Sequence, residues 1–239
     1  MIPYILINGV SSKTINGLLI QSLPPISKPR QRTTLEEIDG RDGDIATVLG
    51  YAAYDKTISI GLRGEYNVDD VISYFNTSGQ ITFSNELDKY YKFAVYNQID
   101  FNKLVRYKTA SVVFHVQPFK YSAEEKELTY TYEGEATEVN IKVVNSGNIY
   151  SKPKLTITGS GTILVYLGNT QIFTISLADT GETIIIDVES MNAYDTNGNY
   201  LNRQVVGDYN NFILAAGNNT ITINGALTSV SIDNYSRWI

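Results

Sequence analysis

The stretch Thr57-Ile58-Ser59-Ile60-Gly61-Leu62 alternates strictly between apolar residues and polar or small ones. A period of two predicts a β-strand with one buried face. The same pattern returns in Ser111–Val116, which places Val112, Phe114 and Val116 on one face. These two stretches favour a β-sheet protein over a helical one.

Other short strands surround these two. Asn8-Gly9 and Asn16-Gly17 separate the first apolar runs, and Asn-Gly tolerates the positive φ angles of tight hairpin turns. The remaining strands predicted in the first half are Tyr4–Ile7, Leu18–Ile20, Gln80–Phe83 and Tyr90–Asn97. The first half is therefore predicted to be a β sandwich or barrel.

One short helix interrupts this pattern at Val68–Asn76. Its apolar residues recur at i, i+3, i+4 and i+7, which is the spacing of one helix face. Asn67 is a suitable N-cap, and Asp69 and Asp70 suit the positive end of the helix dipole. The fold class is thus all-β with one short helix.

Leu23–Asp44 combines three prolines with a run of charges. Proline removes a ladder hydrogen-bond donor, so such a stretch belongs at a sheet edge or in a loop. We expect either a solvated loop or an arm, within Pro24–Asp44, that pairs with a neighbouring subunit. The subunit-interface candidates in this stretch are Pro29, Arg30, Arg32, Arg41 and Asp42.

The second half is predicted to be a separate β domain. The apolar pattern lapses at Ser122–Glu127, and from Leu128 onward five basic residues stand against ten acidic ones. We therefore predict domains at 1–124 and 125–239. Eight short runs separated by Gly, Asn, Asp or Pro indicate a two-sheet sandwich such as a jelly roll. These runs are Glu138–Val144, Lys154–Ile157, Thr162–Tyr166, Ile172–Ser176, Thr183–Val188, Phe212–Leu214, Thr220–Ile223 and Ser229–Ile232.

Composition excludes several classes of protein. Hydrophobic residues make up 43% and charged residues 18%, which is typical of a globular chain. The chain has no Cys, so disulfides and thiolate metal sites are excluded. A net charge of −6 argues against nucleic-acid binding. We see no signal peptide and no apolar window long enough for a membrane span, so we expect a soluble protein made in the cytosol.

Few residues are candidates for catalysis or for binding a metal ion. His115 is the only His, and it is expected to be an ordinary strand residue. Asp187 and Glu189 would share one strand face, as two carboxylates in a solvated position. Asp39–Asp44 lacks the ligand spacing and closing Glu of an EF-hand and is expected to be a turn. We therefore predict no catalytic residue, no cofactor site and no metal site.

The order of features along the chain resembles the distal tail protein family of siphophages, the Dit-like baseplate hub proteins of phages that infect Gram-positive bacteria. The ending Pro118-Phe119-Lys120-Tyr121 of the last strand in the first domain carries the resemblance most strongly. Its other parts are Gly40-Arg41-Asp42-Gly43, the helix followed by Gln80–Phe83 and Tyr90–Ala94, Asn145-Ser146-Gly147, Ser151-Lys152-Pro153, Ile184–Asp187 and Gly217–Ile221.

This resemblance implies a non-enzymatic structural protein of the virion tail tip, assembled in the host cytoplasm. It implies a hexameric ring of first domains, with the tail tube protein on one side and the tail-tip or tail-associated lysin protein on the other. The second domain would be a galectin-like sandwich that points outward, where receptor-binding proteins dock in some family members.

Two other functions stay open at this stage. A carbohydrate-binding module or adhesin could read a cell-wall glycan through the aromatic residues of the second domain, whereas Trp238 would sooner tie down the terminus. Those aromatic residues are Tyr130, Tyr132, Tyr150, Tyr166, Tyr194, Tyr200, Tyr209 and Tyr235. A glycosidase with two facing carboxylates is the third possibility.

Overall fold

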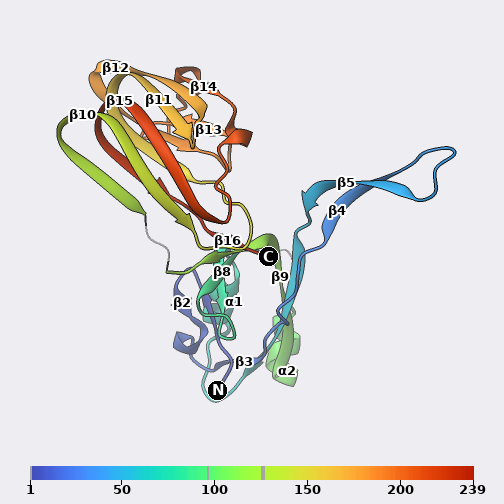
Figure 1. Cartoon of the computed structure of the whole chain (residues 1–239). Helices are drawn as coiled ribbons and strands as arrows, with labels where there is room; N and C mark the ends of the chain where they lie inside the picture. The colour runs from blue at the N-terminus through green and yellow to red at the C-terminus, as the bar shows by residue number, and fades with distance from the viewer. Residues whose placement is uncertain (1, 96, 125–126) are drawn as a thin grey trace. The chain divides into compact units, whose positions relative to one another are not determined.

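The computed structural model describes residues 2–95, 97–124 and 127–239. The chain divides into two compact units, the first running to Ala123 and the second from Glu124 to Trp238 (Figure 1). Residues 125 and 126, where the second domain was predicted to start, lie outside the described residues. The exact domain boundary therefore stays a prediction.

The first unit is built on an antiparallel sheet in the order β2-β1-β7-β8-β9-β6-β3. A separate two-stranded ribbon pairs β4 with β5. The bounds are β1 Ile5–Ile7, β2 Val10–Ser11, β3 Leu18–Ser22, β4 Gln31–Glu37, β5 Asp44–Tyr51, β6 Tyr54–Leu62, β7 Ser78–Phe83, β8 Lys89–Ala94 and β9 Thr109–Ser122, with a 3-10 turn η1 at Ser12–Thr14.

Alternating residues of the central strands form the core of the first unit. Ile58 and Ile60 of β6 are fully buried, as are Val112, Phe114 and Val116 of β9. The β6 and β9 strands pair directly, so these side chains share one face of the sheet. The predicted β architecture of the first half is confirmed.

Two helices pack on this core. In α1, Val68–Phe75, the Asn67 side chain accepts a hydrogen bond from the Asp69 N–H at 3.0 Å, as predicted. In α2, Phe101–Tyr107, Asp100 accepts from the Lys103 N–H at 2.8 Å and Leu104 is buried. The second helix was not predicted, because it is two turns long and directs few apolar residues inward.

The second unit is built on an antiparallel sheet in the order β10-β15-β11-β12-β13, and β14 also pairs with β12. Four of its strands, β10, β11, β12 and β15, are much longer than the predicted runs. Their bounds are β10 Leu128–Asn145, β11 Lys154–Leu167, β12 Thr170–Asp187, β13 Asn192–Tyr194, β14 Val205–Gly207, β15 Gly217–Asp233 and β16 Arg237–Trp238, with 3-10 turns η2 at Asn202–Gln204 and η3 at Tyr209–Asn211.

Irregular pairing explains why the sequence pattern appeared broken in this unit. The β11–β12 register shifts between Gly159 and Gly161, so one strand gives two apolar runs. Phe212–Leu214 is not a strand, although Leu214 is buried and bridges to Ser151. The buried faces of β11, β12 and β15 line one continuous core, which confirms the predicted β class.

Candidate functional site

The most exposed element of the first unit is the hairpin of β4 and β5, residues 31–51, which we call the arm. Every residue of β4 is exposed, and in β5 only Ile45, Gly50 and Tyr51 are partly covered. The arm extends away from the sheet of its own unit (Figure 1). Within the described residues it belongs to no larger sheet, so backbone groups along both outer edges are available for pairing.

One face of the arm carries apolar side chains in water. Leu35 pairs with Ala46 and Thr33 with Val48, and directly paired residues project to the same face. The side chains of Leu35 and Val48 are 61% and 55% exposed. An apolar face on a ribbon without a core is typical of a surface that another chain covers.

The chain that leads into the arm is fixed to the sheet by side-chain hydrogen bonds. The Lys56 ammonium donates to the Pro25 carbonyl oxygen at 2.9 Å. Asn85 donates to the Pro24 carbonyl oxygen at 3.4 Å, and the Tyr54 hydroxyl donates to the Ser27 carbonyl oxygen at 3.4 Å. These bonds set the direction in which the arm leaves the unit.

Lys56 is an unusual residue for this role, because it is only 3% exposed. Its ammonium nitrogen lies 4.8 Å from the centre of the Tyr91 ring, a favourable cation–π position. Burial lowers the pKa of Lys56, and this effect outweighs the nearby Glu86 carboxylate, which raises it. Glu86 in turn pairs with Lys120 at 2.8 Å and accepts from the Tyr91 hydroxyl at 3.0 Å.

The predicted interface candidates occupy two parts of the arm region. Arg30 and Arg32 are exposed at its base, and Arg41 and Asp42 are exposed in the turn between β4 and β5. Pro29 is buried. Arg30 and Ala52 close the arm, since the Ala52 N–H donates to the Arg30 carbonyl oxygen at 2.8 Å. The interface role of these residues stays a prediction.

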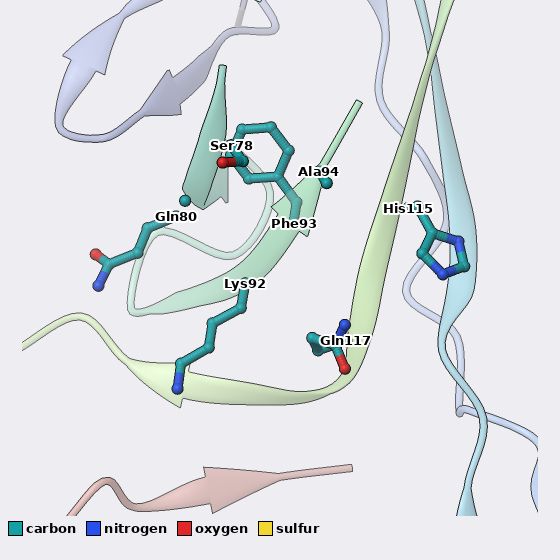
Figure 2. Close-up of a pocket in the computed structure, with 8 residues that line it drawn as sticks. Ser78, Gln80, Lys92, Phe93, Ala94, His115 and Gln117 are labelled. Carbon is teal, nitrogen blue, oxygen red and sulfur yellow. The ribbon is translucent and has the colours of Figure 1, made fainter. Parts of the chain in front are cut away.

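A pocket of about 440 Å³ lies on β7, β8 and β9 of the first unit. It opens where the β8–β9 register shifts, because Tyr91 pairs with Lys120 but Phe93 pairs with Val116. Figure 2 shows that the side chains around it, among them Lys92 and His115, are spread over separate strands and do not converge on one point. The pocket therefore offers no arrangement of acid, base and nucleophile.

His115 is engaged in a cross-strand pair. Its Nδ1 lies 2.7 Å from the Asp55 carboxylate, and the two residues are direct partners in the β6–β9 ladder. The contact between the two side chains therefore joins β6 to β9. This matches the expectation of an ordinary strand residue.

The carboxylates considered from the sequence have structural contacts. Asp187 accepts hydrogen bonds from the backbone N–H groups of Glu189 and Ser190 at 3.0 and 3.2 Å, so it holds a turn. Glu189 pairs with Arg237 at 3.2 Å. Asp39–Asp44 spans the turn of the arm, where Gly40 and Gly43 have positive φ. Within the described ranges, no group of three His, Asp or Glu side chains could hold a metal ion.

Three tyrosines of the second unit serve packing. Tyr130, Tyr132 and Tyr209 pack against its hydrophobic core, and the Tyr209 ring lies 5.1 Å from that of Phe173. Tyr150 and Tyr200 are exposed, at 38% and 73%. The three packed side chains therefore contribute to the core rather than to an aromatic platform for a glycan.

None of the described helices has the length and apolar character needed to cross a membrane. Both α-helices are short elements of the first unit.

Comparison with known proteins gives a likeness in structure alone. No protein-family model and no curated protein matches the sequence. The crystal structure of the Dit protein of phage SPP1, described as a paradigm of the hub adsorption apparatus in phages that infect Gram-positive bacteria, matches with a TM-score of 0.64 at 17% identity. The match covers 97% of this chain and 98% of that chain.

A second solved structure, the baseplate of phage P2 in its activated conformation with calcium, matches with a TM-score of 0.50 at 10% identity and covers 97% of each chain. Identities this low show a shared fold. The chain therefore has the fold of the Dit protein, which confirms at the level of the fold the resemblance to distal tail proteins.

Proposed function

We propose that this chain is a structural subunit of a phage distal tail, the baseplate hub that joins the tail tube to the host-adsorption apparatus. The observation that carries the proposal is the extent of the fold match, which includes both units and nearly the whole of both chains. A match of one unit alone would point only to a common β module.

The side chains support a structural role over an enzymatic one. His115, Asp187 and Glu189 are each engaged in contacts that hold strands or turns. Two departures from ordinary surface chemistry are the exposed apolar face of the arm and the buried Lys56 near its base. Both features suit assembly with other chains.

In this proposal the first domain, 1–124, forms a hexameric ring through the arm. The tail tube protein binds one side of the ring and the tail-tip or tail-associated lysin protein binds the other. The second domain, 125–239, points outward, where a receptor-binding protein can dock. Neither nucleic acid nor membrane insertion has a part in this function, and the assembled protein is located at the virion tail tip.

The mass of the purified full chain in native buffer tests the proposal. We expect six times the chain mass of 26.6 kDa by light scattering. The matched control replaces residues 31–51 with Asn-Gly, a two-residue turn that suits the hydrogen-bonded pair of Arg30 and Ala52. This armless variant should fold and stay a single chain.

Location in the particle is the second test. Cryo-electron microscopy of the virion should show a ring of this chain at the distal end of the tail tube. Absence of the chain from the tail tip would refute the proposed function whatever the mass in solution.

A further inference from the structure

The arm and the residues just before it carry charges in two separate clusters of opposite sign. The root, defined as Lys28, Arg30 and Arg32, is wholly basic and exposed. The tip is acidic, and Arg41 is its only basic residue. Its acidic residues are Glu36, Glu37, Asp39, Asp42 and Asp44, and all are exposed.

The two clusters cannot neutralise each other within one chain. The nearest members of the two clusters, Arg32 and Glu36, are four positions apart on β4, which corresponds to about 13 Å of extended strand. This distance is longer than the Debye length of about 8 Å at physiological salt. Across the described part of the chain, no residue of the root or the tip forms an ion pair. Each cluster is therefore free to attract a charged partner.

We infer that the acidic tip of one copy docks on the basic root of a neighbouring copy, so that the arms follow one another head to tail. The inference rests on the proposed function, because it names the contact that closes the ring. The partner is a second copy because every copy carries both halves of a complementary pair on one element. Opposite charges of this kind set partner choice and orientation.

The surroundings of the two clusters fit this contact. The hydrogen bonds from Lys56, Tyr54 and Asn85 hold the chain before the root in one direction. Between root and tip lie the exposed Leu35 and Val48, which such a contact can cover. A tip-on-root contact joins different surfaces of two copies, and a repeated contact of that type closes into a ring when its rotation permits.

Charge reversal tests the inference. One variant carries Arg30→Glu and Arg32→Glu, which gives the root a net charge of −1, and another carries Glu36→Lys, Glu37→Lys and Asp39→Lys, which gives the tip a net charge of +2. Each variant alone places like charges in contact, so its self-association should weaken at least about tenfold. An equimolar mixture should assemble again, because every tip then meets a root of opposite sign in an alternating ring. The recovered assembly should contain both variants in equal amounts by native mass spectrometry.

A control on another basic surface makes the test specific. Helix α2 presents Lys103 and Arg106 to solvent, so it is another basic surface of the first unit that an acidic tip could choose. Lys103→Glu with Arg106→Glu should leave assembly unchanged. Loss of assembly in this variant, with normal assembly of the root variant, would move the docking site to α2 and overturn the inference.

Cross-linking gives an independent readout, since the chain contains no Cys. Gln31→Cys near the root and Ile38→Cys at the tip, placed on separate chains, should form a disulfide in the mixture, whereas either chain alone should form little. Disulfide formation needs Cα atoms within about 7 Å.

The outcomes separate this inference from the proposed function. Four results would each overturn head-to-tail docking and leave the hub function standing. These are normal assembly of both charge variants, failure of their mixture to assemble, absence of the mixed cross-link, and an assembly of only two chains. A wild-type chain that stays single, together with no cross-link between the two Cys variants, contradicts the docking, whereas absence from the virion tail tip contradicts the hub function.

Discussion

The strands β5 and β6 follow each other with two residues between them, yet they have opposite environments. Val48 and Leu49 of β5 are 55% and 59% exposed, whereas Ile58 and Ile60 of β6 are fully buried. Both strands are rich in β-branched and apolar residues, so strand propensity does not distinguish them. The difference arises because β6 pairs with β3 and β9 over the core, while β5 pairs only with β4.

The exposed apolar side chains of the arm do not stabilise the single chain as those of β6 do. An isolated two-stranded ribbon is marginal in water, and exposed apolar side chains add nothing to its stability as a free element. The same side chains stabilise an assembly when a partner covers them. The core strand therefore serves the fold of one copy, and in the proposed assembly the arm serves contacts between copies.

The largest expected effect that follows from the comparison is on the core strand. Ile60→Ala should lower the free energy of unfolding of the first unit by about 2–5 kcal/mol, because it leaves a cavity in a fully packed site. Urea unfolding measures the loss, and hydrogen exchange assigns it to the first unit. A loss below about 0.5 kcal/mol would mean that β6 is no better packed than the arm.

Lys56 lies where the two environments meet, and its replacement should have the next largest effect. Lys56→Met keeps the length of the side chain but removes the hydrogen bond to Pro25, which should cost about 1–2 kcal/mol. Hydrogen exchange should become faster in residues 24–51. Unchanged exchange in the arm would show that its direction does not depend on Lys56.

The contribution of Lys56 to stability should also depend on pH, in a direction that follows from its pKa. Burial places the pKa of Lys56 below its ordinary value of about 10.5, so the unfolded chain binds more protons between the two values. The contribution of Lys56 to the stability of the wild type should therefore rise with pH in that window. Lys56→Met should lack this part of the rise in urea unfolding measured at several pH values.

Tyr74 provides an effect of the opposite sign, inside the core. Burial raises its pKa above the ordinary value of about 10, so the unfolded chain releases this proton first as the pH rises. The stability that it contributes is present below pH 10 and is lost above it. Tyr74→Phe should reduce this alkaline loss, as measured by unfolding at several pH values above 9. An unchanged alkaline loss would exclude Tyr74 as its source.

The features that the sequence predicts well are those that depend on local contacts. The alternation through Ile58 and Ile60 predicts β6, and Asn67 predicts the start of α1 to the residue. The strands of the arm were not predicted, because Gln31–Glu37 buries no face and therefore has no alternation to detect. The long strands of the second unit appear as separate runs because bends such as Gly159–Gly161 interrupt the pattern.

The candidate site was predicted only in part for a related reason. The sequence locates Arg30, Arg32, Arg41 and Asp42 in a possible arm, and the structure places all four on the exposed hairpin region. The separation of charge along the arm is visible in the sequence, but its meaning depends on the extended geometry of the paired strands. The sequence did not indicate that Lys56 is buried, because a lysine in an alternating strand ordinarily faces solvent.

The arm itself should show the smallest effect on the single chain and a clear effect on the assembly. Leu35→Thr with Val48→Thr keeps β propensity but removes the apolar face, so the free energy of unfolding should stay within about 0.5 kcal/mol of the wild type. Self-association should weaken, because the partner then covers polar side chains, and sedimentation velocity over a range of concentrations measures the change. The matched core substitution Ile60→Thr should reverse this order, with a large loss of stability. Equal losses of stability from the two substitutions would end the distinction between a strand that serves the fold and a strand that serves assembly.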